Sequence, residues 1–202
     1  METIERGKRV LGIDLATDPR WVNLAELELE EILSDHAYCE QKATTSCISL
    51  IQRYPERTEL VQELMPIVTE EWGHFRLVVA EMTKRGMSLG RQRKDQYVNR
   101  LRDFMKRANN REEKLLHELM ICAMIEARSC ERFRLLSLHI SEEELQAFYH
   151  RFMVSEAGHY KLFLKLAKLY FTDEVALAKW QEMLQFEAEL LADMEIRGDR
   201  MH

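Results

Sequence analysis

Residues 70–75 read EEWGHF, and residues 155–160 read SEAGHY. Each stretch contains a glutamate followed three positions later by a histidine, which pairs Glu71 with His74 and Glu156 with His159. Both stretches lie where apolar residues recur every three or four positions, which is the period of an amphipathic helix. Residues three apart on a helix share one face, so each pair can bind one ion together. The two stretches therefore predict a helical protein that holds metal.

Helical patterns extend on both sides of these stretches and fill most of the chain. We expect helices over about 23–53, 58–84, 111–138, 142–170 and 172–195, with a short helix within 97–105. Asn110 and Ser141 precede two of these helices, and each is followed three residues later by a glutamate, the pattern of an N-terminal capping box. Only seven glycines and three prolines occur in 202 residues, which favours helix nearly everywhere, and no segment has a strand pattern.

The connections between these helices define the expected topology. The YPER stretch at 54–57 joins the first two long helices, and a similar short turn joins the third and fourth, so each pair forms an antiparallel hairpin. A long connection separates the two hairpins. Two hairpins joined by a long crossover are the ferritin-like form of a four-helix bundle. The sequence thus predicts an all-α, ferritin-like four-helix bundle with an added C-terminal helix, in one domain over 1–202.

Each of the four bundle helices carries one glutamate within its apolar stripe: Glu40, Glu71, Glu126 and Glu156. The midpoint between the first two falls in the 54–57 turn, and the midpoint between the last two falls at Ser141. Residues equidistant from the turn of an antiparallel hairpin lie at equal height, so we expect all four carboxylates in one layer. Amphipathicity alone does not produce this register.

Four carboxylates in an apolar layer lose hydration and repel one another, so positive charge has to accompany them. Two divalent ions balance the four negative charges, and neutral imidazoles complete the ligand set. Oxygen and imidazole ligands together suit iron or manganese, and the spacing alone does not choose between them. The expected ligands are Glu40, Glu71, His74, Glu126, Glu156 and His159.

Neighbouring residues leave alternatives open. Glu131 competes with Glu126 as a ligand, although the arginines near it suggest that Glu131 lies at a solvated edge. Glu70 is set aside because it lacks the three-residue spacing to a histidine. His36, one turn before a predicted ligand, is either a partner of that ligand or a packed core histidine.

Three residues that disfavour helix lie near the expected ligands. Gly73 and Gly158 each cost about 1 kcal/mol relative to alanine inside a helix. We expect these glycines to let a neighbouring segment approach the ligands closely. Pro66 is expected to kink its helix, or to begin a new one, a turn before Glu71.

Charge is distributed unevenly along the chain. The net charge is −6, yet residues 84–111, here called the basic connector, hold ten lysines and arginines and only two aspartates. Such a segment indicates either an acidic partner such as nucleic acid or a solvated linker. No apolar run approaches the about 20 residues of a membrane span, and the N-terminus has no signal-peptide pattern. The four cysteines form no CxxC pair, so we expect reduced thiols in a cytosolic protein.

Four segments together resemble a known family: DHAYCEQKA at 35–43, EEWGHF at 70–75, IEARSCERF at 125–133 and SEAGHY at 155–160. Over roughly residues 20–195 the chain is similar to the tRNA 2-methylthio-N6-isopentenyladenosine hydroxylases, which are ferritin-like non-haem di-iron monooxygenases. The resemblance implies two iron ions on the same six ligands, O2 as co-substrate and hydroxylation of the isopentenyl group in tRNA. It also implies a cytoplasmic enzyme whose partners are the tRNA anticodon stem-loop and an electron-donating protein or reductase.

This function would give the basic connector a role, because lysine and arginine bind phosphates without regard to sequence. We expect the connector to hold the anticodon stem-loop while the modified base is turned out toward the metals. The expected tRNA contacts are Lys84, Arg85, Arg91, Arg93, Lys94 and Arg100. The alternatives are a ferritin-like or rubrerythrin-like protein for iron storage or peroxide scavenging, and a helical adaptor without metal.

Overall fold

The computed structural model describes residues 12–202 of the chain, and these residues form helices and no strand. In chain order the elements are α1 (Trp21–Leu27), α2 (Leu29–Arg53), α3 (Thr58–Lys84), α4 (Gln96–Leu101), the 3-10 helix η1 (Arg102–Arg107), α5 (Arg111–His139), α6 (Glu143–Tyr170) and α7 (Asp173–Ala192). The expectation of no signal peptide rests partly on residues 1–11, which lie outside the described residues.

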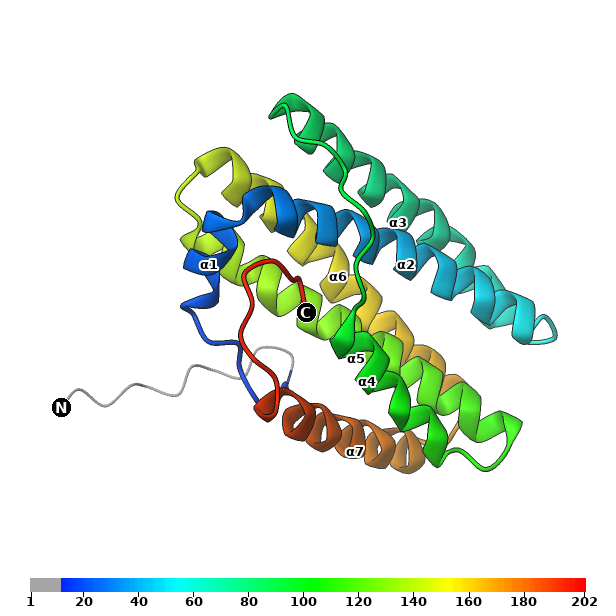
Figure 1. Ribbon diagram of the computed structural model, residues 1–202. Coiled ribbons are helices and arrows are strands. Elements are labelled where there is room, and N and C mark those ends of the chain that lie inside the picture. Colours follow the sequence, from blue (N-terminus) through cyan, green and yellow to red (C-terminus); the bar gives the residue numbers. More distant parts are fainter. Residues whose placement is uncertain (1–11) are drawn as a thin grey trace.

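The four longest helices form the bundle (Figure 1). Helix α2 packs on α3 and α5 packs on α6, each pair joined by a short turn, while α7 lies against α5. The connector leaves the end of α3 and runs back across α2 before α4 begins (Figure 1). The expected all-α, ferritin-like arrangement of two hairpins with a long crossover and a C-terminal helix is therefore confirmed.

Local sequence explains most of the helix boundaries. The Asn110 side chain accepts a hydrogen bond from the Glu113 backbone N–H at 2.9 Å, so the predicted cap of α5 is confirmed. Gly86 follows α3 with a φ of 71°, a left-handed conformation that glycine adopts without strain. The predicted cap at Ser141 is wrong, because α6 begins after Glu142 and the Ser141 N–H donates to Glu26 instead.

Two further boundary predictions need correction. The first expected helix is split at Glu28, whose φ of −120° and ψ of 41° lie outside the helical region. The separate α1 buries Trp21, Val22 and Ala25. A straight continuation of α2 would carry these three side chains to other positions. Helix α3 runs unbroken through Pro66, so the proline does not begin a new helix.

The two glycines beside the predicted ligands do not serve close packing. A Cβ atom placed on Gly73 or Gly158 meets no heavy atom of another described residue within 4 Å. The prediction that a neighbouring segment approaches these positions is therefore wrong. Gly158 is exposed and Gly73 is half-buried, so both lie toward the outside of the bundle.

The IEARSCERF segment of α5 carries a buried ion network in addition to a predicted ligand. Arg128 is fully buried and donates two hydrogen bonds to the Glu187 carboxylate of α7, at 2.9 and 2.8 Å. Glu131 is also buried and accepts hydrogen bonds from the backbone and hydroxyl of Thr17. The expected solvated edge at Glu131 is wrong, because these partners cover it and direct it away from the four predicted carboxylates. The network ties α5 to α7 and to the segment before α1.

The residues after α7 turn back along α5 and end inside the fold (Figure 1). Asp35 of α2 accepts hydrogen bonds from the Arg200 side chain and the Met201 backbone, both at 2.8 Å. Arg93 of the connector pairs with Asp199 at 2.8 Å. These contacts attach the C-terminal segment to both α2 and the connector.

Candidate metal centre

Six side chains from α2, α3, α5 and α6 converge in the middle of the bundle. They fall into two overlapping groups, in each of which one ligand atom per residue lies within 4.8 Å of the others. The first group is Glu40, Glu71, His74 and Glu156, and the second is Glu71, Glu126, Glu156 and His159. Glu71 and Glu156 belong to both groups. The arrangement therefore suits two neighbouring cations that share two carboxylates and have one further glutamate and one histidine each.

Both histidines direct Nδ1 toward the carboxylates. His159 Nδ1 lies 2.7 Å from Glu71 Oε1 and 3.5 Å from Glu156 Oε2. His74 Nδ1 lies 3.3 Å from Glu40 Oε2, and 3.7 and 3.8 Å from Glu71 and Glu156. The i, i+3 spacing within α3 and α6 produces this convergence, because it places glutamate and histidine on one helix face.

The donor atoms fit divalent metal ions. Among residues 12–202, both carboxylate oxygens of Glu71, Oε1 of Glu156 and Nδ1 of His74 and His159 are buried without a hydrogen bond of acceptable geometry. Buried polar atoms in proteins are normally satisfied, so this many together indicates partners of another kind. Carboxylate and imidazole ligands suit iron and manganese.

Comparison with known proteins identifies the family. Residues 6–202 match the family model described as tRNA-(MS[2]IO[6]A)-hydroxylase (MiaE). The chain belongs to this family. It is 37% identical over 184 residues to the tRNA 2-(methylsulfanyl)-N(6)-isopentenyladenosine(37) hydroxylase of Pseudomonas putida, which covers 90% of this chain and 88% of that protein. The protein of the same name from Salmonella typhimurium is 30% identical over 147 residues, or 72% of this chain and 51% of that protein.

A solved structure of a protein named for another activity has the same fold. Protein 43 with aldehyde deformylating oxygenase activity from Synechococcus matches with a TM-score of 0.88 and 29% identity, covering 94% of each chain. The expected resemblance to the tRNA hydroxylases and the ferritin-like fold are both confirmed. This MiaE family member is an enzyme of the hydroxylase class, and none of these relatives favours the storage alternative.

The electrostatics of the MiaE centre show how strongly it requires positive charge. Burial, reinforced by Glu71 and Glu156, raises the pKa of Glu40 well above its usual value, and burial together with Glu156 does the same to Glu126. Burial alone would lower the pKa of His159, but contacts with Glu156 and Glu71 outweigh it and raise that pKa to about 11. In the metal-free chain, bound protons thus balance part of the carboxylate charge, and metal cations would replace these protons on binding.

One residue that the sequence reasoning set aside contacts both metal-facing histidines. Glu70 Oε2 lies 3.3 Å from His159 Nε2, and Glu70 Oε1 lies 3.9 Å from His74 Nε2. The Ser155 hydroxyl donates to Glu70 Oε1 at 2.6 Å and holds it between the rings. A carboxylate on the outer nitrogen of a metal-bound histidine orients the ring and increases its basicity. The i, i+4 spacing from Glu70 to His74 was the available signal.

His36 combines the two roles that the sequence left open. Its Nε2 lies 2.7 Å from Oε1 of Glu40, and the ring is completely buried. Four aromatic side chains, Phe133, Phe148, Tyr149 and Phe152, surround it with ring centroids 4.6–6.1 Å away. Burial and the nearby His74 lower the pKa of His36 well below its usual value. A neutral His36 therefore packs in the core and also positions Glu40.

A cavity of about 860 Å³ lies beside the centre and includes Glu126 in its wall. Its buried lining is largely apolar and includes Leu50, Ile121 and Phe163. Its exposed lining is polar and includes Arg53 and Arg102. The cavity thus runs from a basic outer surface to an apolar interior next to a predicted ligand.

The six predicted tRNA contacts differ in their surroundings. Lys84, Arg85, Arg93 and Arg100 each form an ion pair with an acidic side chain, at 2.5–3.2 Å. Arg91 and Lys94 are exposed and pair with no residue in the described part of the chain. Two of the six predicted contacts are therefore uncompensated cations near the outer lining of the cavity, where Gln92 and Asp95 lie.

Proposed function

We propose that this protein holds two iron ions on the six converging side chains and, with O2, hydroxylates the isopentenyl group of 2-methylthio-N6-isopentenyladenosine in tRNA. The family assignment supports the reaction class. The observation that carries the proposal is the pair of overlapping ligand groups with an apolar cavity against one of them. Iron rather than manganese follows from the family resemblance, not from the donor set.

The protein's own residues hold the ions, balance their charge and exclude water. When bound, two iron ions supply the redox chemistry that activates O2, which carboxylates and imidazoles do not provide themselves. Glu71 and Glu156, which belong to both ligand groups, would be shared by the two ions. Glu40 with His74 would hold one ion, and Glu126 with His159 would hold the other. Glutamates can change between bridging and terminal binding, which suits ions whose charge changes during turnover.

The cavity provides a place for the hydrocarbon part of the substrate. An isopentenyl group is apolar, and the buried lining around Ile121 and Phe163 would remove it from water at about 25 cal/mol per Å² of buried area. Glu126 at the inner wall would place the reacting methyl group beside the metal centre. The purine and the tRNA backbone would then lie toward Arg53 and Arg102 at the outer surface.

The basic connector is proposed to bind the anticodon stem-loop while the modified base is turned into the cavity. Arg91 and Lys94 are the proposed main phosphate contacts, because neither has an acidic partner among the described residues. Lys84, Arg85, Arg93 and Arg100 would contribute less, since binding phosphate competes with their ion pairs.

The proposal also includes an electron-donating partner and a cytoplasmic location. Insertion of one oxygen atom from O2 requires two external electrons, so an electron-donating protein or reductase is a required partner. No helix in residues 12–202 is long and apolar enough to cross a membrane. The four cysteines are free thiols, and a tRNA substrate supports a cytoplasmic location.

The decisive experiment is nucleoside analysis of tRNA after incubation with iron-loaded, reduced protein and O2. We expect the isopentenyladenosine nucleoside to gain one oxygen atom, and 18O2 to supply that atom. The Glu71→Ala variant, which removes a bridging ligand, should give no product although it still binds tRNA. An unchanged nucleoside with fully iron-loaded wild-type protein would refute the proposed reaction.

A binding experiment tests the role of the connector separately. The logarithm of tRNA affinity should fall with the logarithm of salt concentration, and each lost phosphate contact should reduce that slope by about 0.7–0.9. We expect Arg91→Ala and Lys94→Ala each to reduce the slope, whereas Lys165→Ala on α6 should leave it unchanged. Equal slopes for all three variants would show that the connector does not bind phosphate.

A further inference from the structure

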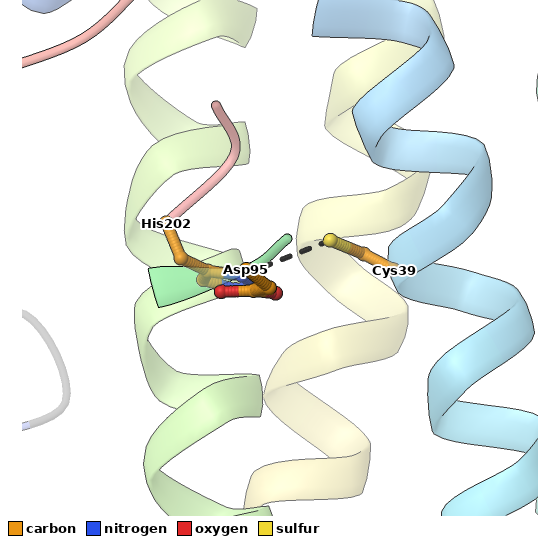
Figure 2. Close-up of side chains that lie close together, drawn as sticks. All are labelled: Cys39, Asp95 and His202. Carbon is orange, nitrogen blue, oxygen red and sulfur yellow. Dashed lines mark hydrogen bonds between the residues drawn. The ribbon is translucent and has the colours of Figure 1, made fainter. Parts of the chain in front are cut away.

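A second group of potential metal ligands lies outside the six-residue centre. Cys39 of α2, Asp95 at the start of α4 and His202 of the C-terminal segment point toward one another (Figure 2). One ligand atom from each lies within 4.8 Å of the others. The three residues come from parts of the chain that are far apart in sequence, so only the tertiary fold brings them together.

We propose that Cys39, Asp95 and His202 form a zinc site. Thiolate, imidazole and carboxylate are the ligands that Zn²⁺ uses, and three protein ligands with one open position are common in its sites. With Zn–S near 2.3 Å, Zn–N near 2.05 Å and a tetrahedral angle, sulfur and nitrogen should lie about 3.6 Å apart. The observed distance from Cys39 Sγ to His202 Nδ1 is 3.7 Å.

The imidazole is oriented for this role by its neighbours. The Ser129 hydroxyl lies 2.9 Å from Nε2 of His202, and the tautomer protonated on Nε2 donates to it and leaves the Nδ1 lone pair facing Cys39. The ring of Tyr97 stacks on His202 with centroids 5.3 Å apart.

Lys42 is the cation that a zinc ion would have to displace. Its Nζ lies 2.6 Å from Oδ2 of Asp95, while the other carboxylate oxygen accepts the Val98 N–H at 2.9 Å. The Lys42 side chain is 28% exposed, and lysine side chains readily extend their ammonium into water, so the ammonium can move into solvent while Asp95 remains in place. The site therefore has two competing occupants, the lysine and the metal, and removing the lysine should favour the metal.

The three ligands also line the 860 Å³ cavity. A water molecule from the cavity can supply a fourth ligand. A zinc ion would join α2, the connector and the C-terminal segment at the polar part of the cavity wall, and would stabilise that wall against opening. The proposal is independent of the reaction at the six-residue centre.

Cobalt titration of the full-length protein tests the site directly. Co²⁺ replaces Zn²⁺, and a thiolate ligand produces an intense near-ultraviolet charge-transfer band. None of the six residues of the other centre contains sulfur, so this band distinguishes a thiolate site from that centre, and the variants below distinguish Cys39 from the other cysteines. We expect one thiolate-bound cobalt per chain, displaced by zinc. The band should be lost in Cys39→Ser, which keeps the size of the side chain, and retained in Cys47→Ser.

Two further variants separate a metal site from a simple ion pair. Asp95→Asn should weaken cobalt binding at least tenfold, while Lys42→Met should tighten it at least about tenfold because it removes a competing positive charge. Zinc should raise the melting temperature of the wild type more than that of Cys39→Ser. Absence of the band in both the wild type and Lys42→Met, or its persistence in Cys39→Ser, would overturn the proposal. In that case the Lys42–Asp95 ion pair alone occupies this position.

Discussion

Replacing Glu126 with glutamine is expected to stabilise the metal-free protein while weakening its binding of metal. Glu126 is only 5% exposed, and burial together with the nearby Glu156 raises its pKa well above the usual value. The folded metal-free chain therefore keeps a proton on this side chain at pH values at which the unfolded chain has already lost it. Glutamine has nearly the same shape and is neutral in both states, so it avoids the cost of taking up a proton.

The pH dependence of the unfolding free energy sets an upper limit on the stability that Glu126→Gln can gain. Because the folded pKa lies above the unfolded one, the contribution of Glu126 to stability is fully present below about pH 4.5 and is lost as the pH rises toward the folded pKa. The loss is about 1.4 kcal/mol per pH unit, so it reaches at most about 3.4 kcal/mol at pH 7. We expect Glu126→Gln to be more stable than the wild type at pH 7 by an amount within this limit, and by almost nothing at pH 4.5. For a chain of this size the limit corresponds to a rise of about 7–14 °C in melting temperature.

The assay is urea unfolding of metal-free protein at several pH values, followed by circular dichroism. Glu189→Gln is the matched control, because Glu189 is an exposed glutamate on α7 and should show no such dependence. Adding Fe²⁺ should reverse the order of stability, since the wild type binds the metal more tightly. The reasoning would be refuted if the metal-free Glu126→Gln variant were less stable than the wild type at pH 7. It would also be refuted if the difference in unfolding free energy between the two proteins were the same at pH 4.5 as at pH 7.

Three other experiments test the shared ligands and their surroundings. Glu71→Ala should reduce bound iron from two ions per chain to none, whereas Glu40→Ala should retain one, as measured by metal analysis after anaerobic loading. Glu70→Gln should weaken metal affinity about 10–100-fold without removing a ligand, because it affects the outer nitrogens of both histidines. Arg128→Ala should destabilise the protein by about 3–5 kcal/mol in denaturant unfolding, because it leaves Glu187 buried without its partner.

Controls and contrary outcomes are available for each of these three. Equal iron content in Glu71→Ala and Glu40→Ala would contradict shared bridging. Glu63→Gln, an acid near the surface of the same helix, should leave metal affinity unchanged. Arg128→Lys tests whether charge alone suffices, and stability equal to the wild type would contradict the need for two hydrogen bonds to Glu187.

The convergence of the six predicted ligands could be predicted because it depends on local and nearly local geometry. The spacing from Glu71 to His74 and from Glu156 to His159 places each pair on one helix face. The equal distances of Glu40 and Glu71 from their turn then set a common height. Short turns leave an antiparallel hairpin little freedom in register, so sequence separation translates into position along the bundle.

Residues whose partners come from distant segments could not be placed in this way. The sequence predicts a solvated edge at Glu131, yet Thr17 and the buried Arg128 cover it. Glu70 was set aside on spacing within α3, although its partners include His159 and Ser155 of α6. The residue spacing within α3 does not show which side chains of α6 lie opposite Glu70.

The sequence by itself determined the helices, the hairpin register and the convergence of six side chains, because each depends on helical periodicity and on the lengths of short turns. Only the tertiary structure decided which carboxylates are shared, which cations of the connector lack partners and where the C-terminal segment lies. Those features arise from packing between elements separated by many residues, and the periodic pattern of one helix does not indicate which residues of another helix it contacts. The juxtaposition of Cys39, Asp95 and His202 is of this second kind.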